Sequence, residues 1–91
     1  MMYKPIAART VCVDGASLSI QASRTHYCKP RADVGPYSHK EVGYITDDDG
    51  NPLTPPEEWR EYADGDFPSS VYGYVPVDLI DDFIAKHGGP K

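Results

Sequence analysis

The chain has 91 residues, of which 40% are hydrophobic, and it carries a formal net charge of −5. That length predicts one domain over residues 1–91 with a modest core, and that composition excludes a disordered chain. The sequence pI near 4.9 argues against a protein that binds nucleic acid through dense positive charge.

We expect no signal peptide and no membrane-spanning segment in this sequence. Residues 1–15, MMYKPIAARTVCVDG, lack the continuous apolar region of a signal peptide. No run approaches the roughly 18 apolar residues that span a bilayer, so we expect a soluble, cytoplasmic protein. Cys12 and Cys28 are too few for a disulfide framework. We expect two reduced thiols, with Cys12 on a strand and partly buried.

Two strands joined by a tight turn are predicted in the first part of the chain. Residues 9–13 (RTVCV) are rich in β-branched residues, and Asp14–Gly15 is a typical hairpin turn. Residues 17–23 alternate in polarity, which predicts a strand with one buried face. Its buried face would hold Leu18, Ile20 and Ala22, and its solvent face Ser17, Ser19, Gln21 and Ser23.

Two further strands are predicted after an irregular segment broken by Pro30, Gly35 and Pro36. Residues 40–46 (KEVGYIT) form the third, with Val42 and Tyr44 on one face. Gly43 within it indicates a bulge or a close backbone approach. Residues 47–50 (DDDG) read as a turn, and residues 70–75 (SVYGYV) as a fourth strand.

The C-terminal segment has the pattern of an amphipathic helix. Its apolar stripe comprises Val77, Ile80 and Ile84, with Leu79 and Phe83 beside them. Pro76 at its start and Gly88 just past its end are the usual boundaries of a helix. The sequence therefore predicts an α+β fold. An antiparallel sheet of three or four strands would carry one C-terminal helix on one face and a long acidic loop.

The stretch from Asp47 to Pro68 gathers eight acidic residues, four prolines and a single base, Arg60. It has no regular period, although residues 55–63 (PPEEWREYA) are compatible with one or two helical turns. Outside residues 45–68 the chain has six acids and eight bases. The charge is therefore asymmetric, which concerns partners and steering rather than the fold.

Three aromatic residues lie inside this acidic stretch, whereas a purely solvating segment is poor in aromatics. Such a surface suits a basic groove on another protein, because rings provide contact area and charges steer association. Ordered carboxylates can also occupy a site that normally accepts nucleic-acid phosphates. We expect Trp59 and Tyr62 to hold the stretch against the sheet. The predicted partner-binding residues are Asp47, Asp48, Asp49, Glu57, Glu58, Trp59, Glu61, Tyr62, Asp64 and Asp66.

Two other readings of the charge remain open. The acidic stretch is also compatible with a plain solvated loop. Alternatively, the basic residues Arg24, Lys29 and Arg31, which surround His26 and Tyr27, form the active face.

Metal binding and catalysis have weaker signals. His26 and Cys28 lack the paired spacing of a zinc site. Asp47, Asp49, Asn51 and Glu58 match EF-hand loop positions, but Pro52 falls where glycine is required. Cys28 with His26 or His39 would make a thiol–imidazole pair, the least supported reading. We predict no metal, no cofactor and no enzymatic activity.

Three segments carry a resemblance to a known group of proteins: SIQASRTHYCKPR, GPYSHKEVGY and VYGYVPVDLIDDFIAKHGG. Over most of residues 18–89 the chain resembles small proteins encoded by bacteriophages and prophages. Some small acidic phage proteins are anti-CRISPR or anti-restriction factors. By that analogy the partner would be a host nuclease complex, such as a CRISPR effector complex in the bacterial cytoplasm. A small phage adaptor without mimicry is the alternative, and the resemblance assigns no individual functional residue.

Overall fold

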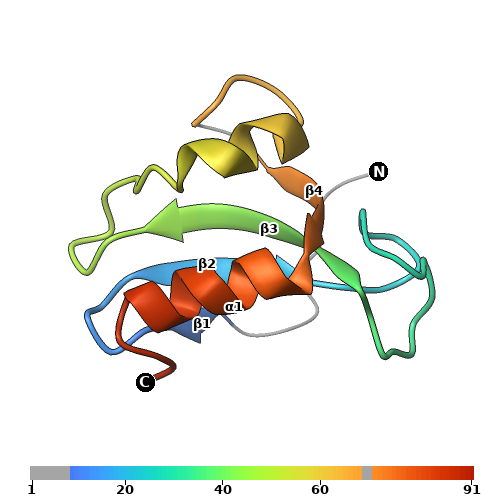
Figure 1. Ribbon diagram of the computed structural model, residues 1–91, viewed down its shortest axis with the longest axis horizontal. Helices are drawn as coiled ribbons and strands as arrows, with labels where there is room; N and C mark the ends of the chain where they lie inside the picture. The colour runs from blue at the N-terminus through green and yellow to red at the C-terminus, as the bar shows by residue number, and fades with distance from the viewer. Residues whose placement is uncertain (1–8, 69–70) are drawn as a thin grey trace.

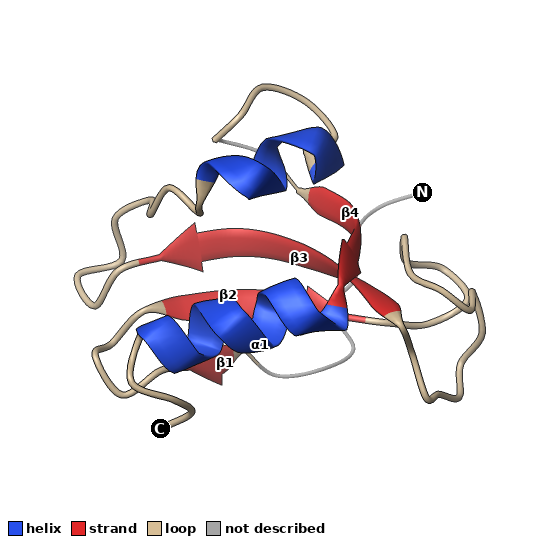
Figure 2. Ribbon diagram, viewed as in Figure 1, coloured by secondary structure: helices blue, strands red, loops and turns tan. Residues whose placement is uncertain are grey.

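The structure, a computed structural model, describes residues 9–68 and 71–91, and it confirms the predicted α+β fold (Figure 1). Four antiparallel strands form one sheet in the order β1-β2-β3-β4. They are β1 (Thr10–Val11), β2 (Ser17–Gln21), β3 (His39–Thr46) and β4 (Tyr72–Pro76). A 3-10 helix, η1 (Glu57–Tyr62), lies between β3 and β4, and the α-helix α1 (Val77–Lys86) follows β4 (Figure 2).

The predicted hairpin joins β1 to β2. The Cys12 N–H donates to the Ala16 carbonyl at 2.7 Å, and Gly15 takes a φ of +95° that few other residues adopt. The side chain of Asp14 stabilises the turn, because its Oδ1 accepts the Ala16 N–H at 3.0 Å. His87, which follows α1, contacts the same turn, since its Nδ1 lies 2.6 Å from the Asp14 Oδ2.

The polar face of β2 is buried, which corrects the prediction of a single buried face. Leu18 is fully buried as expected, but Ser19, Gln21 and Ser23 are buried too, and Ser17 is half-buried. Their polar groups are satisfied within the fold: the Gln21 Nε2, for example, donates to the Ser19 Oγ at 3.1 Å. Alternation along a strand distinguishes two faces, but it does not show whether other segments cover the polar one.

A bulge in β3 reverses the predicted orientation of Tyr44. The strand pairs on either side of it are Ser17 with Thr46 and Ser19 with Gly43, so β3 has one extra residue there. Tyr44 takes a φ of +52° and turns outward, with 58% of its surface exposed. Ile45 instead joins Val42 in the core. The expectation that Val42 and Tyr44 share a face was wrong, because the extra residue shifts the alternation.

A second bulge, in β4, places Tyr74 on the surface in the same way. Its flanking pairs are Lys40 with Val75 and Val42 with Tyr72. Tyr74 has a φ of +56° and is 44% exposed. At the neighbouring Gly73, an added Cβ would lie 3.1 Å from the Cβ of Tyr27, so the glycine allows a close approach there. Both bulges hold a tyrosine in the left-handed region that residues other than glycine rarely adopt.

The core cluster of the described residues receives side chains from the sheet and from both helices. α1 contributes Ile80 and Phe83, as its apolar stripe predicted. The buried members of the cluster are Cys12, Ala16, Leu18, Val42, Ile45, Trp59, Tyr72, Val75, Ile80 and Phe83. Cys12 is fully rather than partly buried, and both cysteines are free thiols. Within the described residues, no helix is long and apolar enough to cross a membrane.

Candidate functional site

The acidic stretch is folded against the sheet, so the prediction of one long loop is not confirmed. It starts with a tight turn in which the Asp47 Oδ1 accepts the N–H groups of Asp49 and Asn51, each at 2.9 Å. The chain then runs back beside β3, where the Leu53 N–H donates to the Ile45 carbonyl at 3.0 Å. The two helical turns that residues 55–63 allow are present as η1. Prolines on its N-terminal side are compatible with this path, because they need no hydrogen-bond acceptor.

Trp59 fastens η1 to the core. Its ring meets Tyr72 edge-on at a centroid distance of 5.6 Å and Phe83 at 5.7 Å. The expectation that Trp59 holds the stretch on the sheet is confirmed. Trp59 is fully buried and so offers no exposed surface for its predicted second role, contact with a partner. Tyr62, the other aromatic predicted to hold the stretch, is half-buried and packs against the core.

The carboxylates of the stretch stay at the surface around this buried ring. Seven are exposed, and Asp47 is half-buried. The only base of the stretch is engaged, because the Arg60 Nε donates to the Glu57 Oε1 at 2.5 Å and its guanidinium lies 4.4 Å from the Phe67 ring centroid. The hydrogen bond from Arg60 lowers the pKa of Glu57. Across residues 9–68 and 71–91 the structure gives no ion pair to the other acids of the stretch.

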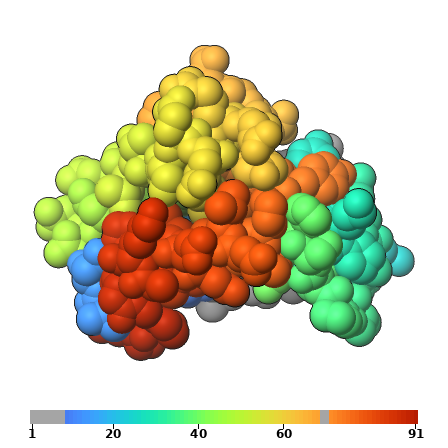
Figure 3. Space-filling model, in the orientation of Figure 1, coloured from blue at the N-terminus to red at the C-terminus, as the bar shows by residue number. Residues whose placement is uncertain are grey.

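α1 adds further acids that the sequence did not connect with this stretch. Asp78, Asp81 and Asp82 are exposed on α1, and the contact between Trp59 and Phe83 brings η1 beside that helix. Figure 3 shows the two elements adjoining on one face of the molecule. We use the term acidic surface for these residues together: Asp47, Asp48, Asp49, Glu57, Glu58, Glu61, Asp64, Asp66, Asp78, Asp81 and Asp82.

The basic residues lie elsewhere, in the segment between β2 and β3 on the right of Figure 1. Arg24, Lys29 and Arg31 are all exposed. The Arg24 Nε is 3.4 Å from the Asp33 Oδ2, and the Arg31 guanidinium lies 5.8 Å from the Tyr27 ring centroid. The ion pair with Asp33 offsets the charge of Arg24, whereas the contact with the neutral Tyr27 ring leaves the charge of Arg31 in place.

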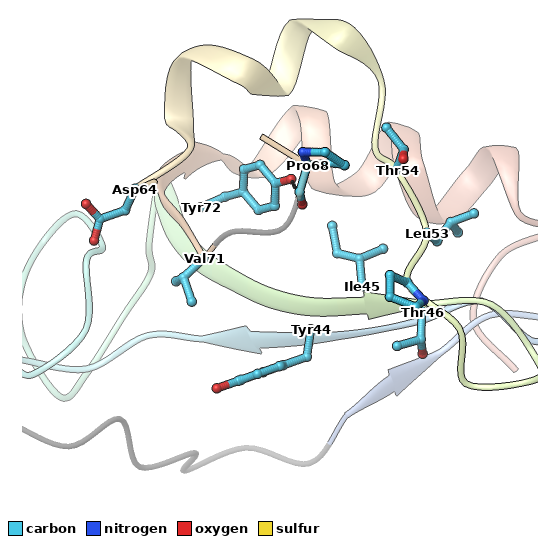
Figure 4. Close-up of a pocket in the computed structure, with 10 residues that line it drawn as sticks. Tyr44, Ile45, Thr46, Leu53, Thr54, Asp64, Pro68, Val71 and Tyr72 are labelled. Atoms are coloured by element: carbon cyan, nitrogen blue, oxygen red, sulfur yellow. Dashed lines mark hydrogen bonds between the residues drawn. The ribbon is translucent and has the colours of Figure 1, made fainter. Parts of the chain in front are cut away.

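A cavity of about 510 Å³ opens between β3 and the segments that follow it (Figure 4). Ile45 points into it from β3, and Leu53 and Tyr72 form opposite walls. The Tyr72 hydroxyl donates to the Pro68 carbonyl at 2.7 Å, which closes one side. Its lining is mainly apolar and includes the Asp64 carboxylate.

The residues considered for metal binding and catalysis are placed as follows. The ligand oxygens of Asp47, Asp48 and Asp49 lie within 4.8 Å of one another, but an exposed acidic cluster alone does not define a metal site. His26 and Cys28 are buried. The Cys28 Sγ donates to the Ser23 carbonyl at 3.1 Å, the situation of a structural thiol rather than of a reactive one.

Comparison with known proteins gave no further constraint. No protein-family model, curated protein or solved structure matches this chain.

Proposed function

We propose that the protein inhibits a nucleic-acid-binding protein complex, such as a phage-targeting defence nuclease, by docking its acidic surface in the basic groove of that complex. The observation that carries the proposal is an ordered array of carboxylates. Trp59 holds η1 in the core, and Glu57, Glu58 and Glu61 stay on the outer side of the same short helix. Carboxylates on a folded backbone lose less conformational freedom on binding than those of a mobile acidic tail do.

Electrostatics favour a basic partner for this surface. Arg60, the only base between Asp47 and Pro68, is paired with Glu57. Among the described residues no ion pair joins a base to the other carboxylates of the surface. Exposed charges of one sign attract a groove of the opposite sign and raise the association rate. A groove lined by lysine and arginine for nucleic acid has the charge this surface complements, and occupying it would exclude the nucleic acid.

The test has two stages, capture of the partner and competition for its ligand. The tagged protein is used to isolate a complex from the bacterial host, and the complex is identified by mass spectrometry. The captured complex is then offered its nucleic acid with increasing amounts of the protein. Inhibition by mimicry predicts that nucleic acid and protein exclude each other. Simultaneous binding of both would instead indicate the adaptor function.

Three groups of substitutions localise the contact. They are Asp47, Asp48 and Asp49 to Asn, Glu57, Glu58 and Glu61 to Gln, and Asp78, Asp81 and Asp82 to Asn. Asparagine at residue 47 keeps an acceptor for the two turn N–H groups, so the first group preserves the turn. Each group is expected to slow association, and the effect should shrink at high salt. The Debye length falls from about 10 Å at 0.1 M to about 3 Å at 1 M ionic strength.

Charge reversal at Arg24, Lys29 and Arg31 is the matched control, because these cations lie outside the acidic surface. The proposal predicts that this control binds the partner at least as tightly as the unaltered protein, because the added negative charge does not oppose a basic groove. If the control abolishes binding while the three acidic groups leave it intact, the basic segment is the active face and the proposal is refuted.

A further inference from the structure

A second cavity, of about 390 Å³, is walled by three tyrosines and two carboxylates. Tyr27 comes from the segment after β2, Tyr62 from η1 and Tyr74 from β4. The Tyr74 N–H donates to the Tyr27 carbonyl at 2.9 Å, which joins two of these elements. In Figure 1, β4 lies between η1 and the segment after β2. Glu61 and Asp64 complete the wall at the η1 side.

The backbone is shaped to present these rings. The β4 bulge gives Tyr74 its φ of +56° and leaves it exposed beside Tyr27, which is 43% exposed. The two rings stack at a centroid distance of 5.9 Å. The absence of a Cβ at Gly73 allows Tyr27 to sit against β4. Large exposed rings held this way are typical of binding surfaces rather than of cores.

The residues that line this cavity favour a positively charged ligand. Aromatic faces attract an ammonium or guanidinium group, and adjacent carboxylates add charge and hydrogen-bond acceptors. Burial and then the neighbouring Glu61 carboxylate raise the pKa of Tyr62. Rings of this chain do receive guanidinium groups, since Arg31 lies over Tyr27 and Arg60 over Phe67. A planar guanidinium can stack on a ring and bind a carboxylate together, which a compact ammonium does less well.

We propose that this cavity binds an arginine side chain of the partner protein, with its guanidinium against the rings of Tyr62 and Tyr74 and within reach of Glu61 and Asp64. The inference rests on the proposed function and adds a specific contact to it. Glu61 and Asp64 belong both to the acidic surface and to the cavity, so steering by the surface would bring a basic partner to this place. The acidic residues would increase the rate of association with the partner, and the aromatic cavity would then bind one arginine of that partner.

The first experiment uses a small probe and needs no partner. N-acetyl-arginine N-methylamide is titrated into the protein, and the ring signals of the tyrosines are followed by NMR. N-acetyl-citrulline N-methylamide is the matched control, because citrulline keeps the shape and loses the charge. We expect the arginine probe to shift Tyr27, Tyr62 and Tyr74 and to bind about three- to thirtyfold more tightly than the citrulline probe. Equal effects of the two probes would overturn the proposal.

The affinity of variants for the arginine probe then shows whether the probe binds in this cavity. Tyr74→Leu removes a ring, and Asp64→Asn removes a charge without changing the shape of the wall. Each is expected to weaken the arginine probe about three- to thirtyfold. Tyr44→Leu is the control, because Tyr44 also sits in a bulge at positive φ but does not line this cavity. An arginine affinity unchanged by both Tyr74→Leu and Asp64→Asn refutes the site. If Tyr74→Leu fails to fold, Asp64→Asn and the probe pair still decide the question.

The same variants separate this inference from the proposed function. If Tyr74→Leu binds the captured complex as tightly as the unaltered protein while the acidic-surface groups fail to bind, the proposed function stands and the arginine site falls. If the arginine probe binds as expected but the complex and nucleic acid bind together, the cavity is a cation site and the proposed inhibition is wrong.

Discussion

Replacement of Trp59 by alanine tests whether the acidic stretch is part of the folded core. Trp59 is fully buried and lies between Tyr72 of β4 and Phe83 of α1. Alanine would leave a cavity at the point where η1, the sheet and α1 meet. Substitution of a buried tryptophan or phenylalanine by alanine destabilises a protein by about 3–5 kcal/mol. The two aromatic contacts place Trp59 in the upper part of that range.

A loss of that size is large for a domain of 91 residues, whose free energy of unfolding is of the order of 5–14 kcal/mol. Urea denaturation measures it. Far-ultraviolet circular dichroism is the appropriate signal, because Trp59 is the only tryptophan of the chain and its fluorescence disappears in the variant. With a slope of about 1–2 kcal/mol per molar urea, the midpoint should fall by roughly 2–5 M.

Two controls make the result interpretable. Trp59→Phe keeps an aromatic ring in the same place and should lose less stability than Trp59→Ala. Arg60→Ala changes the next residue, which is exposed and whose ion pair with Glu57 is a surface contact, and it should move the midpoint little. A Trp59→Ala midpoint equal to that of the unaltered protein would show that η1 is not docked on the sheet. The acidic surface would then have no folded support, and this basis of the proposed function would be refuted.

Three further predictions concern the rest of the fold. Phe83→Ala should cost about 3–5 kcal/mol in chemical denaturation, because Phe83 is buried in the core cluster; an unchanged midpoint would contradict the docking of α1. The hydrogen bonds from the Ala16 N–H and then from His87 lower the pKa of Asp14 below its ordinary 3.8. Its contribution to stability is therefore full above that value and is lost as the pH falls through the lower folded pKa, so the stability gap between the protein and Asp14→Asn should be present at pH 7 and should close in acid. A gap that widens in acid would contradict this sign. Finally, elemental analysis of the purified, untagged protein should find no stoichiometric zinc or calcium, and near-stoichiometric metal would refute the prediction.

The sequence predicted elements well where one local signal decides the structure. The turn at Asp14–Gly15 and the helix with Ile80 and Phe83 on its buried side are both present. It failed where the outcome depends on contacts distant in sequence. The burial of Gln21 depends on what covers β2, and the exposure of Tyr44 depends on an extra residue in the pairing of β2 with β3. The alternation of polar and apolar residues along a strand shows neither which segments cover the strand nor where a bulge occurs.

The candidate site, too, was predicted where a local signal was enough and missed where distant contacts decide. Counting charges identified the stretch from Asp47 to Asp66, but charge counts cannot show which aromatic is buried. Trp59 proved to be a core residue, whereas Tyr74, which sequence analysis assigned only to a strand, lies on the surface at a bulge. The acids of α1 were not connected with the stretch either, because their proximity depends on the contact between Trp59 and Phe83.

This arrangement determines which substitutions can test binding. Trp59 supports the frame, so a loss of binding in Trp59→Ala would follow from unfolding as readily as from a missing contact. The exposed carboxylates Glu57, Glu58 and Glu61 do not contribute to the core, and changing them to glutamine alters charge with little effect on folding. A binding defect in these variants, at unchanged denaturation midpoint, therefore reports on the interface itself. The same reasoning applies to Asp64→Asn in the tyrosine cavity, where a change of charge without a change of shape separates recognition of a cation from simple burial of apolar area.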